Sequence, residues 1–153
     1  MGIDLYAARA HADSLNSSAS DISAVKDMLT LFKNRLPMYW NADEMRNITV
    51  AIDQLISEAN SISTDLRNIS SDIIITANEI KHEEEVAKAR KEFLKAQEIL
   101  NKRKVKYSDT VQIYIADPSD YNEQCVRSEY SRYSAARVDY DNALRKLRSL
   151  ESQ

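Results

Sequence analysis

Apolar side chains in the N-terminal part of the chain recur at a spacing of seven residues. One line of positions runs through Ala8, Leu15, Ile22, Leu29 and Leu36, and an intervening line runs through His11, Ser18, Val25 and Phe32. Two such lines form the seam along which helices pack in a coiled coil. The pattern therefore predicts a helix, and it predicts that this helix ends where Pro37 pushes Leu36 away from helical geometry.

The most regular apolar pattern follows this break. Steps of four and three residues alternate through Ile48, Ile52, Leu55, Ala59, Ile62, Leu66, Ile69 and Ile73, and the line continues through Thr76 to Ile80. Asn41 or Asp43 is expected to cap the helix, and Glu44 places negative charge in its first turn, where the helix dipole favours it. A second long helix with one apolar stripe is therefore predicted.

The seven-residue step slips by one beyond residue 80. The next seam runs through Val86, Phe93, Leu100, Tyr107 and Tyr114, with Ala89 and Ala96 between. Such a slip bends or overwinds a coiled coil and can pass the helix to a different partner. Segment 111–116 is rich enough in β-branched residues to be a strand or a loop instead of a helix. Asp117 and Pro118 are expected at the N-cap and first position of a last helix, with its seam at Val126, Tyr133, Tyr140, Leu147 and Leu150.

These patterns predict an all-α protein of three helices, arranged as long antiparallel hairpins with coiled-coil-type packing. Short connections make sequential helices antiparallel, so the first helix should pack on the first half of the second, and the third helix on the second half. The expected domains are a helical hairpin over residues 1–80, with its turn at 37–42, and a helical extension over 81–153. The extension is expected to be an antiparallel helix pair with a break near 108–118.

Composition favours long helices and adds a charge asymmetry. The 153 residues include one Gly and two Pro, which leaves little to interrupt a helix. Residues 1–80 carry 6 basic and 11 acidic groups, whereas residues 81–153 carry 15 and 13. No apolar run approaches the roughly 18 residues of a membrane span, and the N-terminus lacks the features of a cleavable signal. We therefore expect a protein made in the cytoplasm without a signal peptide and without membrane insertion.

Few residues are suited to catalysis or to metal binding. Gly2 is the only glycine, which excludes a glycine-rich phosphate loop, and Cys125 has no second cysteine to join it in a disulfide or zinc site. Glu79 and His82 have the Glu-x-x-His spacing of di-iron bundles, but the other histidine, His11, has no Glu three residues before it. We expect no enzymatic activity, no cofactor and no metal site.

A basic cluster is the feature that suggests nucleic acid. It consists of Lys102, Arg103, Lys104 and Lys106. Acidic residues stand on either side of it, and no nucleic-acid-binding motif surrounds it. We interpret it as a solvated helix face and expect no nucleic-acid partner.

Apolar residues that the predicted seams do not use indicate a protein partner. They lie near the first turn and around Ile73, at Met28, Leu31, Met38, Tyr39, Trp40, Ile74 and Ile75. Two helices joined by a turn bury only one stripe each, and such a pair seldom has enough apolar contact to stand alone. We predict that these residues bind another helical protein, in a homodimer or, as we favour, a heterodimer. The alternative is that the third helix folds back over them.

The first turn contains Trp40, Asn41 and Ala42, and the chain opens with Ile3-Asp4-Leu5-Tyr6. Taken alone, the turn reads as a hairpin plug in which Trp40 covers the open end of the seam. Together with its flanking helices it resembles the WXG100 proteins of bacterial type VII secretion, and the opening resembles the start of the related LXG-type substrates. The resemblance covers residues 1 to about 80, with Ala42 where the family has Gly.

The resemblance implies a non-enzymatic, secreted helical hairpin that pairs with a second helical protein or with the N-terminal domain of a toxin. It also implies handling by a membrane-associated secretion ATPase and export to the cell surface or medium. The export signal of the family, Tyr-x-x-x-Asp/Glu, is absent from the C-terminal half, so a partner is expected to supply it. A cytosolic structural or adaptor coiled coil unrelated to secretion is the alternative, because it needs the same seams.

Overall fold

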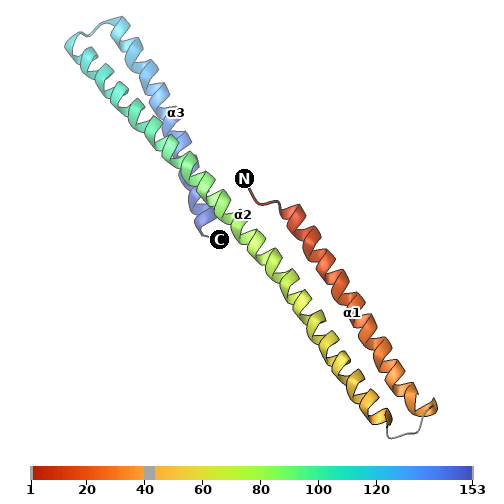
Figure 1. The fold of residues 1–153 in the computed structure, drawn as a ribbon. Coiled ribbons are helices and arrows are strands. Elements are labelled where there is room, and N and C mark those ends of the chain that lie inside the picture. The colour runs from red at the N-terminus through yellow and green to blue at the C-terminus, as the bar shows by residue number, and fades with distance from the viewer. Residues whose placement is uncertain (1, 40–43, 153) are drawn as a thin grey trace. The chain divides into compact units, whose positions relative to one another are not determined.

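A computed structural model describes residues 2–39 and 44–152 of the chain, with the side chains of 2–38 and 45–152. The described residues form three helices and no strand: α1 spans Leu5–Tyr39, α2 spans Glu44–Ala116 and α3 spans Asp120–Glu151 (Figure 1). The predicted all-α fold of three helices is therefore confirmed. Contacts divide the chain into two compact units, residues 1–81 and 82–153, which are called unit 1 and unit 2 below.

Helix α1 is capped at its start and continues past its proline. The Asp4 carboxylate accepts hydrogen bonds from the backbone N–H groups two and three residues further on, at 2.9 and 3.2 Å, and so satisfies two free donors of the first turn. The prediction that Pro37 ends the helix is wrong, because α1 runs to Tyr39 with Pro37 in its last turn. A proline so near the helix end removes a single backbone hydrogen bond, and Leu36 before it is buried.

The connection between α2 and α3 comprises residues 117–119, so the break expected near 108–118 is short. Segment 111–116 is helical and is neither strand nor loop. The predicted cap of α3 is wrong by two residues, because the extended residue Ser119 caps the helix and its hydroxyl accepts a hydrogen bond from the Asn122 N–H at 3.3 Å. Asp117 instead accepts two hydrogen bonds from the side-chain amide of Asn122, one at its backbone carbonyl (2.8 Å) and one at its carboxylate (3.2 Å).

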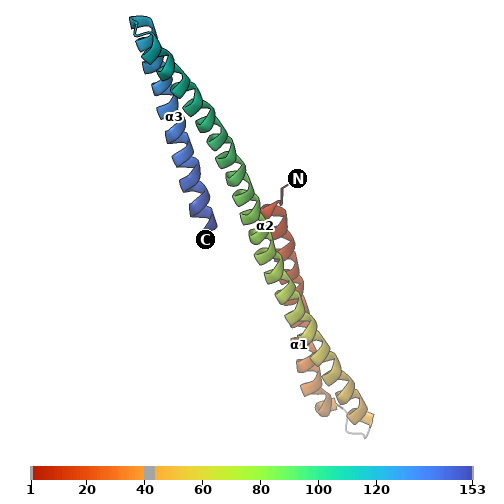
Figure 2. The ribbon, with the colours of Figure 1, turned by 90° about the vertical axis from the view of Figure 1, so that its left-hand side faces the viewer.

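In unit 1, α1 lies antiparallel to the first half of α2 (Figures 1 and 2). Two hydroxyl groups of α2 donate hydrogen bonds to carbonyls of α1: Ser63 to Ala19 and Ser70 to Ala12, both at 2.9 Å. Ala12 and Ala19 are completely buried. Hydrogen bonds from the side chains of one helix to the backbone of the next require close approach, which small residues at the contact allow.

One of the two seam lines predicted for each helix of unit 1 is wrong. The lines 8, 15, 22, 29, 36 of α1 and 52, 59, 66, 73 of α2 are buried or half-buried, as predicted, but Ile80 at the end of the second line is 39% exposed. The intervening lines are shifted by one residue. The structure places Ala12, Ala19, Lys26 and Lys33 on the seam instead of His11, Ser18, Val25 and Phe32, and it places Ile56, Ser63, Ser70 and Ala77 there instead of Leu55, Ile62, Ile69 and Thr76.

In unit 2, α3 lies antiparallel to the remaining part of α2, and both predicted seams are confirmed. Their residues, Val86, Phe93, Leu100, Tyr107 and Tyr114 on α2 and Val126, Tyr133, Tyr140, Leu147 and Leu150 on α3, are buried or half-buried. Phe93 packs on Tyr140 with ring centroids 5.3 Å apart, and Tyr107 lies 5.6 Å from Tyr130 and 5.8 Å from Tyr133. Aromatic rings thus fill much of this seam.

Ion pairs join the two helices of unit 2. They are Arg90–Glu151 at 2.8 Å, Lys146–Glu92 at 2.8 Å and Arg103–Glu129 at 3.6 Å. The side chain of Glu129 is only 15% exposed, so the last of these pairs lies within the packed seam. Glu129 also pairs with Arg132 of its own helix, so the pair with Arg103 is the contact of this carboxylate that depends on how α2 and α3 are aligned.

The pKa of Glu92 should report on the contact between α2 and α3. A hydrogen bond from Lys146 and the charge of that residue lower this pKa from its ordinary value. The stability contributed by the pair is therefore present above the ordinary pKa of Glu and is lost as the pH falls through the lowered pKa. We expect Lys146→Ala to return the Glu92 pKa toward its ordinary value, as measured by NMR titration of the side-chain carboxyl.

The control for this titration is Glu98, whose pKa is lowered by Lys102 of the same helix. It should keep its pKa in Lys146→Ala. A Glu92 pKa that does not change in the variant would show that the two helices do not pair at this position in solution.

Candidate functional site

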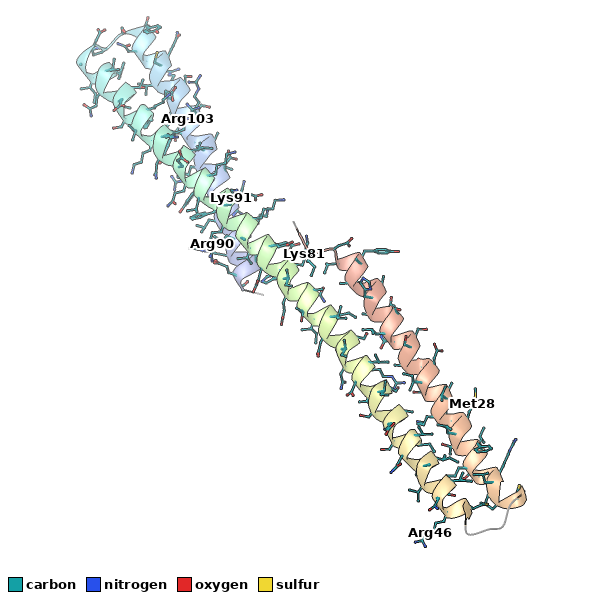
Figure 3. All side chains as sticks on the ribbon, in the orientation of Figure 1. Met28, Arg46, Lys81, Arg90, Lys91 and Arg103 are labelled. Carbon is teal, nitrogen blue, oxygen red and sulfur yellow. The ribbon has the colours of Figure 1, made fainter. Side chains whose placement is uncertain are left out.

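The residues predicted to bind a partner lie at two ends of unit 1. Met28, Leu31 and Met38 of α1 are 66%, 57% and 79% exposed, and Figure 3 shows Met28 on the side of α1 that faces away from α2. At the other end, Ile75 of α2 is exposed and Ile74 is half-buried. The structure does not bring these two groups together. Trp40, Asn41 and Ala42, the candidate caps Asn41 and Asp43, and the side chain of Tyr39 lie outside the described residues.

A more continuous apolar surface is formed by residues that the sequence pattern assigned to the seam. Their side chains are between 48% and 56% exposed although each is large and apolar. We call this surface the apolar face of unit 1; it consists of Val25 and Phe32 of α1 and Leu55, Ile62 and Ile69 of α2.

The five residues lie on one flank of the hairpin because of the helix geometry. Positions 25 and 32 directly precede the seam positions 26 and 33 of α1, and positions 55, 62 and 69 directly precede the seam positions 56, 63 and 70 of α2. In an antiparallel pair, such equivalent lines fall on the same side of the seam. The hydrogen bonds between residues 19 and 63 and between residues 12 and 70 set a register in which Val25 lies between the levels of Leu55 and Ile62, and Phe32 lies on the turn side of Leu55.

The opposite flank of unit 1 is polar. There Ser23 of α1 forms a hydrogen bond at 2.9 Å with the hydroxyl of Ser63, and it accepts another at 3.3 Å from the guanidinium of Arg67. Near the same end as Phe32, Lys33 forms an ion pair with Asp53. The hairpin therefore has one flank closed by polar contacts and one apolar flank, and only the apolar flank would gain from covering by another helix.

A shallow pocket of about 350 Å³ adjoins the apolar face at the N-terminal end of α1. Its lining consists of Ile3, Ala8, Ile69, Asp72, Ile73, Thr76 and Ala77. Ile69 belongs both to this pocket and to the apolar face. The apolar flank thus ends in a depression that can receive a protruding side chain.

Unit 2 offers an internal comparison, because its helices are joined at the flanks by charged residues. Glu92, which directly precedes the seam residue Phe93, forms an ion pair with Lys146, which directly precedes the seam residue Leu147. In unit 1 the equivalent flank positions include Val25, Phe32, Leu55, Ile62 and Ile69. On α2 of unit 2 the same line alternates charged and apolar residues, Glu92, Ile99, Lys106 and Ile113, so it is not continuously apolar as the face of unit 1 is.

Sequence reasoning missed the apolar face because it assigned these residues to the interior. A signal for it was nevertheless present: each heptad of residues 48–73 holds apolar or small residues at three positions, and a two-helix seam uses two of them. The third position is left for another neighbour, as in bundles of three or more helices.

Other chemistry is sparse in the described part of the chain. Among those residues no group of three or more His, Cys, Asp or Glu side chains is arranged to hold a metal ion. Within the same residues no helix combines the length and the apolar character of a membrane span. Cys125 is a half-buried free cysteine on α3.

The chain was compared with protein-family models, with curated proteins and with solved structures. None of the three comparisons found a match. Its function is therefore inferred from the apolar face and from the sequence pattern.

Proposed function

We propose that this chain is a non-enzymatic protein that acts by pairing the hairpin of unit 1 with a second helical protein, as a partner or substrate of a bacterial type VII secretion system. The observation that carries the pairing is the apolar face, with five large side chains about half-exposed on one flank. The resemblance of residues 1 to about 80 to the WXG100 proteins supports the link to secretion. The antiparallel hairpin of α1 and α2 is compatible with that resemblance.

The energetics of the apolar face set the expected strength of binding. Full burial of a large apolar side chain is worth about 1.5–3 kcal/mol, so covering five half-exposed ones contributes roughly 4–8 kcal/mol. Association itself costs a comparable amount, at least about 4 kcal/mol. The apolar face can therefore drive binding, and tight binding requires further contacts around it.

A charge placed in the apolar face should abolish pairing without unfolding the hairpin. We expect Ile62→Asp to weaken binding to helical proteins encoded next to the gene by about 30-fold or more, because an aspartate buried by the partner would lack a counter-ion. Light scattering of the purified full chain, alone and mixed with each neighbouring product at micromolar concentration, measures the complex.

The matched control is Ser61→Asp, which adds the same charge at an exposed position one residue away, outside the apolar face. Circular dichroism should show both variants to be helical. A chain that stays monomeric and binds none of the neighbouring products would contradict the pairing, and equal binding by both variants would place the contact elsewhere.

The link to secretion requires a separate experiment. In the organism that encodes the chain, deletion of the type VII secretion ATPase should remove either this protein or the protein bound to it from the culture medium. The alternative of a cytosolic adaptor coiled coil is favoured by either of two results. In the first, this protein and its bound partner reach the medium in the deletion strain as they do in the wild type. In the second, neither of them is found in the medium of the wild type.

A further inference from the structure

The edge of the apolar face on α2 is acidic. Glu58, Asp65, Asp72 and Glu79 stand seven residues apart and are exposed. The first three each follow a residue of the apolar face by three positions, which makes them its neighbours on the helix surface. Among the described side chains, no Lys, Arg or His forms an ion pair with these four carboxylates.

The edge on α1 is acidic at Asp21, which is exposed and stands four residues before Val25 of the apolar face. Most basic residues of unit 1 lie elsewhere. Lys26 and Lys33 are at seam positions, and Arg67 is on the polar flank, where it contacts Ser23. Arg35, near the end of α1, is beside the apolar face, and His11 lies on the same line of α1 as Val25 and Phe32. Charge in unit 1 is therefore segregated, with carboxylates along the borders of the apolar face.

This segregation argues against a second copy of the chain as the occupant. A two-fold dimer brings the same surface of both copies together. If α2 packs beside α2 of the other copy, Asp65 and Asp72 meet the same carboxylates. If α2 packs beside α1 of the other copy, they meet Asp21. Both arrangements place like charges at the edges of a contact whose apolar centre is small, and like charges so placed suppress association.

We propose that the apolar face of unit 1 receives one amphipathic helix of a different protein, whose apolar stripe is flanked by Lys or Arg residues at intervals of about seven. This inference rests on the proposed function, in which unit 1 pairs with a helical protein. The apolar stripe covers Phe32, Ile62 and their neighbours. The flanking cations pair with the carboxylates at positions 58, 65 and 72 and thereby select the partner and its direction.

Two synthetic helical peptides test the charge requirement on the full-length chain. Both contain four heptads with the same leucine stripe, and they differ only in having Lys or Glu at the flanking positions. We expect the Lys peptide to bind at least ten times more tightly than the Glu peptide by fluorescence anisotropy, and the difference to shrink at high salt because exposed charges are screened.

Neutralisation of the acidic edge should remove this preference. The variant Glu58→Gln, Asp65→Asn, Asp72→Asn should bind the Lys peptide roughly ten-fold more weakly. The control variant Gln54→Lys, Ser61→Lys, Asn68→Lys changes the net charge by the same amount, at exposed positions with the same spacing but outside the apolar face. It should bind within two-fold of the wild type. Ile62→Asp makes the face more acidic, so charge attraction alone would strengthen its binding of the Lys peptide. A loss of binding in this variant therefore shows that the apolar contact is also required.

The outcomes separate the inference from the function on which it rests. If both peptides bind equally and Ile62→Asp abolishes both, the apolar face binds helices but the basic partner is refuted. If the full chain alone forms a dimer that Ile62→Asp dissociates, the occupant is a second copy and the inference is overturned. If neither peptide binds, the apolar face is not a helix-binding surface, and the proposed function fails with it.

Discussion

Replacement of Leu66 by Asp should destabilise unit 1 by about 3–5 kcal/mol, whereas Arg67→Asp should cost about 1 kcal/mol or less. Leu66 lies on the seam line that faces α1, so its replacement would place a carboxylate without a counter-ion between two helices. Arg67 is exposed, and its contact with α1 is a single hydrogen bond of 3.3 Å to Ser23. Urea denaturation followed by circular dichroism gives the free energies of unfolding.

The pair of variants is matched, because both place the same residue at neighbouring positions of one helix. A third variant, Ile62→Asp, tests the seam assignment itself. Ile62 is 49% exposed, so its replacement should cost much less stability than Leu66→Asp even though both residues are large and apolar. If the Ile62 and Leu66 variants are equally destabilised, the seam includes both lines and the apolar face does not exist in solution.

Enlargement of Ala19 should have the second largest effect on stability. Ala19 is completely buried, and its carbonyl accepts the hydrogen bond from Ser63. A leucine there would push α1 and α2 apart, with a cost of about 1–3 kcal/mol for overpacking and about 1 kcal/mol more if the hydrogen bond breaks. The change in denaturation midpoint of Ala19→Leu measures this cost.

Ala24→Leu is the control for this experiment, since Ala24 is exposed on the same helix and the substitution has the same effect on helix propensity. It should leave the midpoint nearly unchanged. If Ala19→Leu is as stable as Ala24→Leu, the helices do not approach closely at this level, and the seam would have to pass through Ser18 and Val25 instead.

The two units therefore differ in how much stability each would gain from binding a partner helix. Unit 2 fills its seam with aromatic rings and joins its helices by ion pairs. Unit 1 packs one line of its seam through alanine and serine and leaves five large apolar residues, those of the apolar face, on one flank. Close packing of small residues buries little apolar surface, so unit 1 gains more from a further helix than unit 2 does.

Details at the helix ends could not be read from residue type alone. Pro37 was expected to end α1, and Asp117 was expected to cap α3. Both expectations rest on average preferences of a residue for a position. A proline in the last turn costs only one hydrogen bond, and packing of Leu36 against the other helix offsets it. At the start of α3, Ser119 stands closer to the helix than Asp117 and takes the role of cap.

The sequence by itself determined the three long helices, one of the two seam lines of each helix in unit 1, and the seams of both helices in unit 2. These features follow from the seven-residue period and from the scarcity of glycine and proline.

Only the tertiary structure decided which second line faces the other helix in unit 1. Neighbouring lines of residues on a helix surface are about 100° apart at most. When three apolar lines lie side by side, either the first two or the last two can therefore face the other helix and form the seam. Contact between the helices at Ala12, Ala19, Ser63 and Ser70 selects the one with small residues, because it allows closer packing and the hydrogen bonds between the helices. The same choice turns Val25, Phe32, Leu55, Ile62 and Ile69 outward and creates the candidate site.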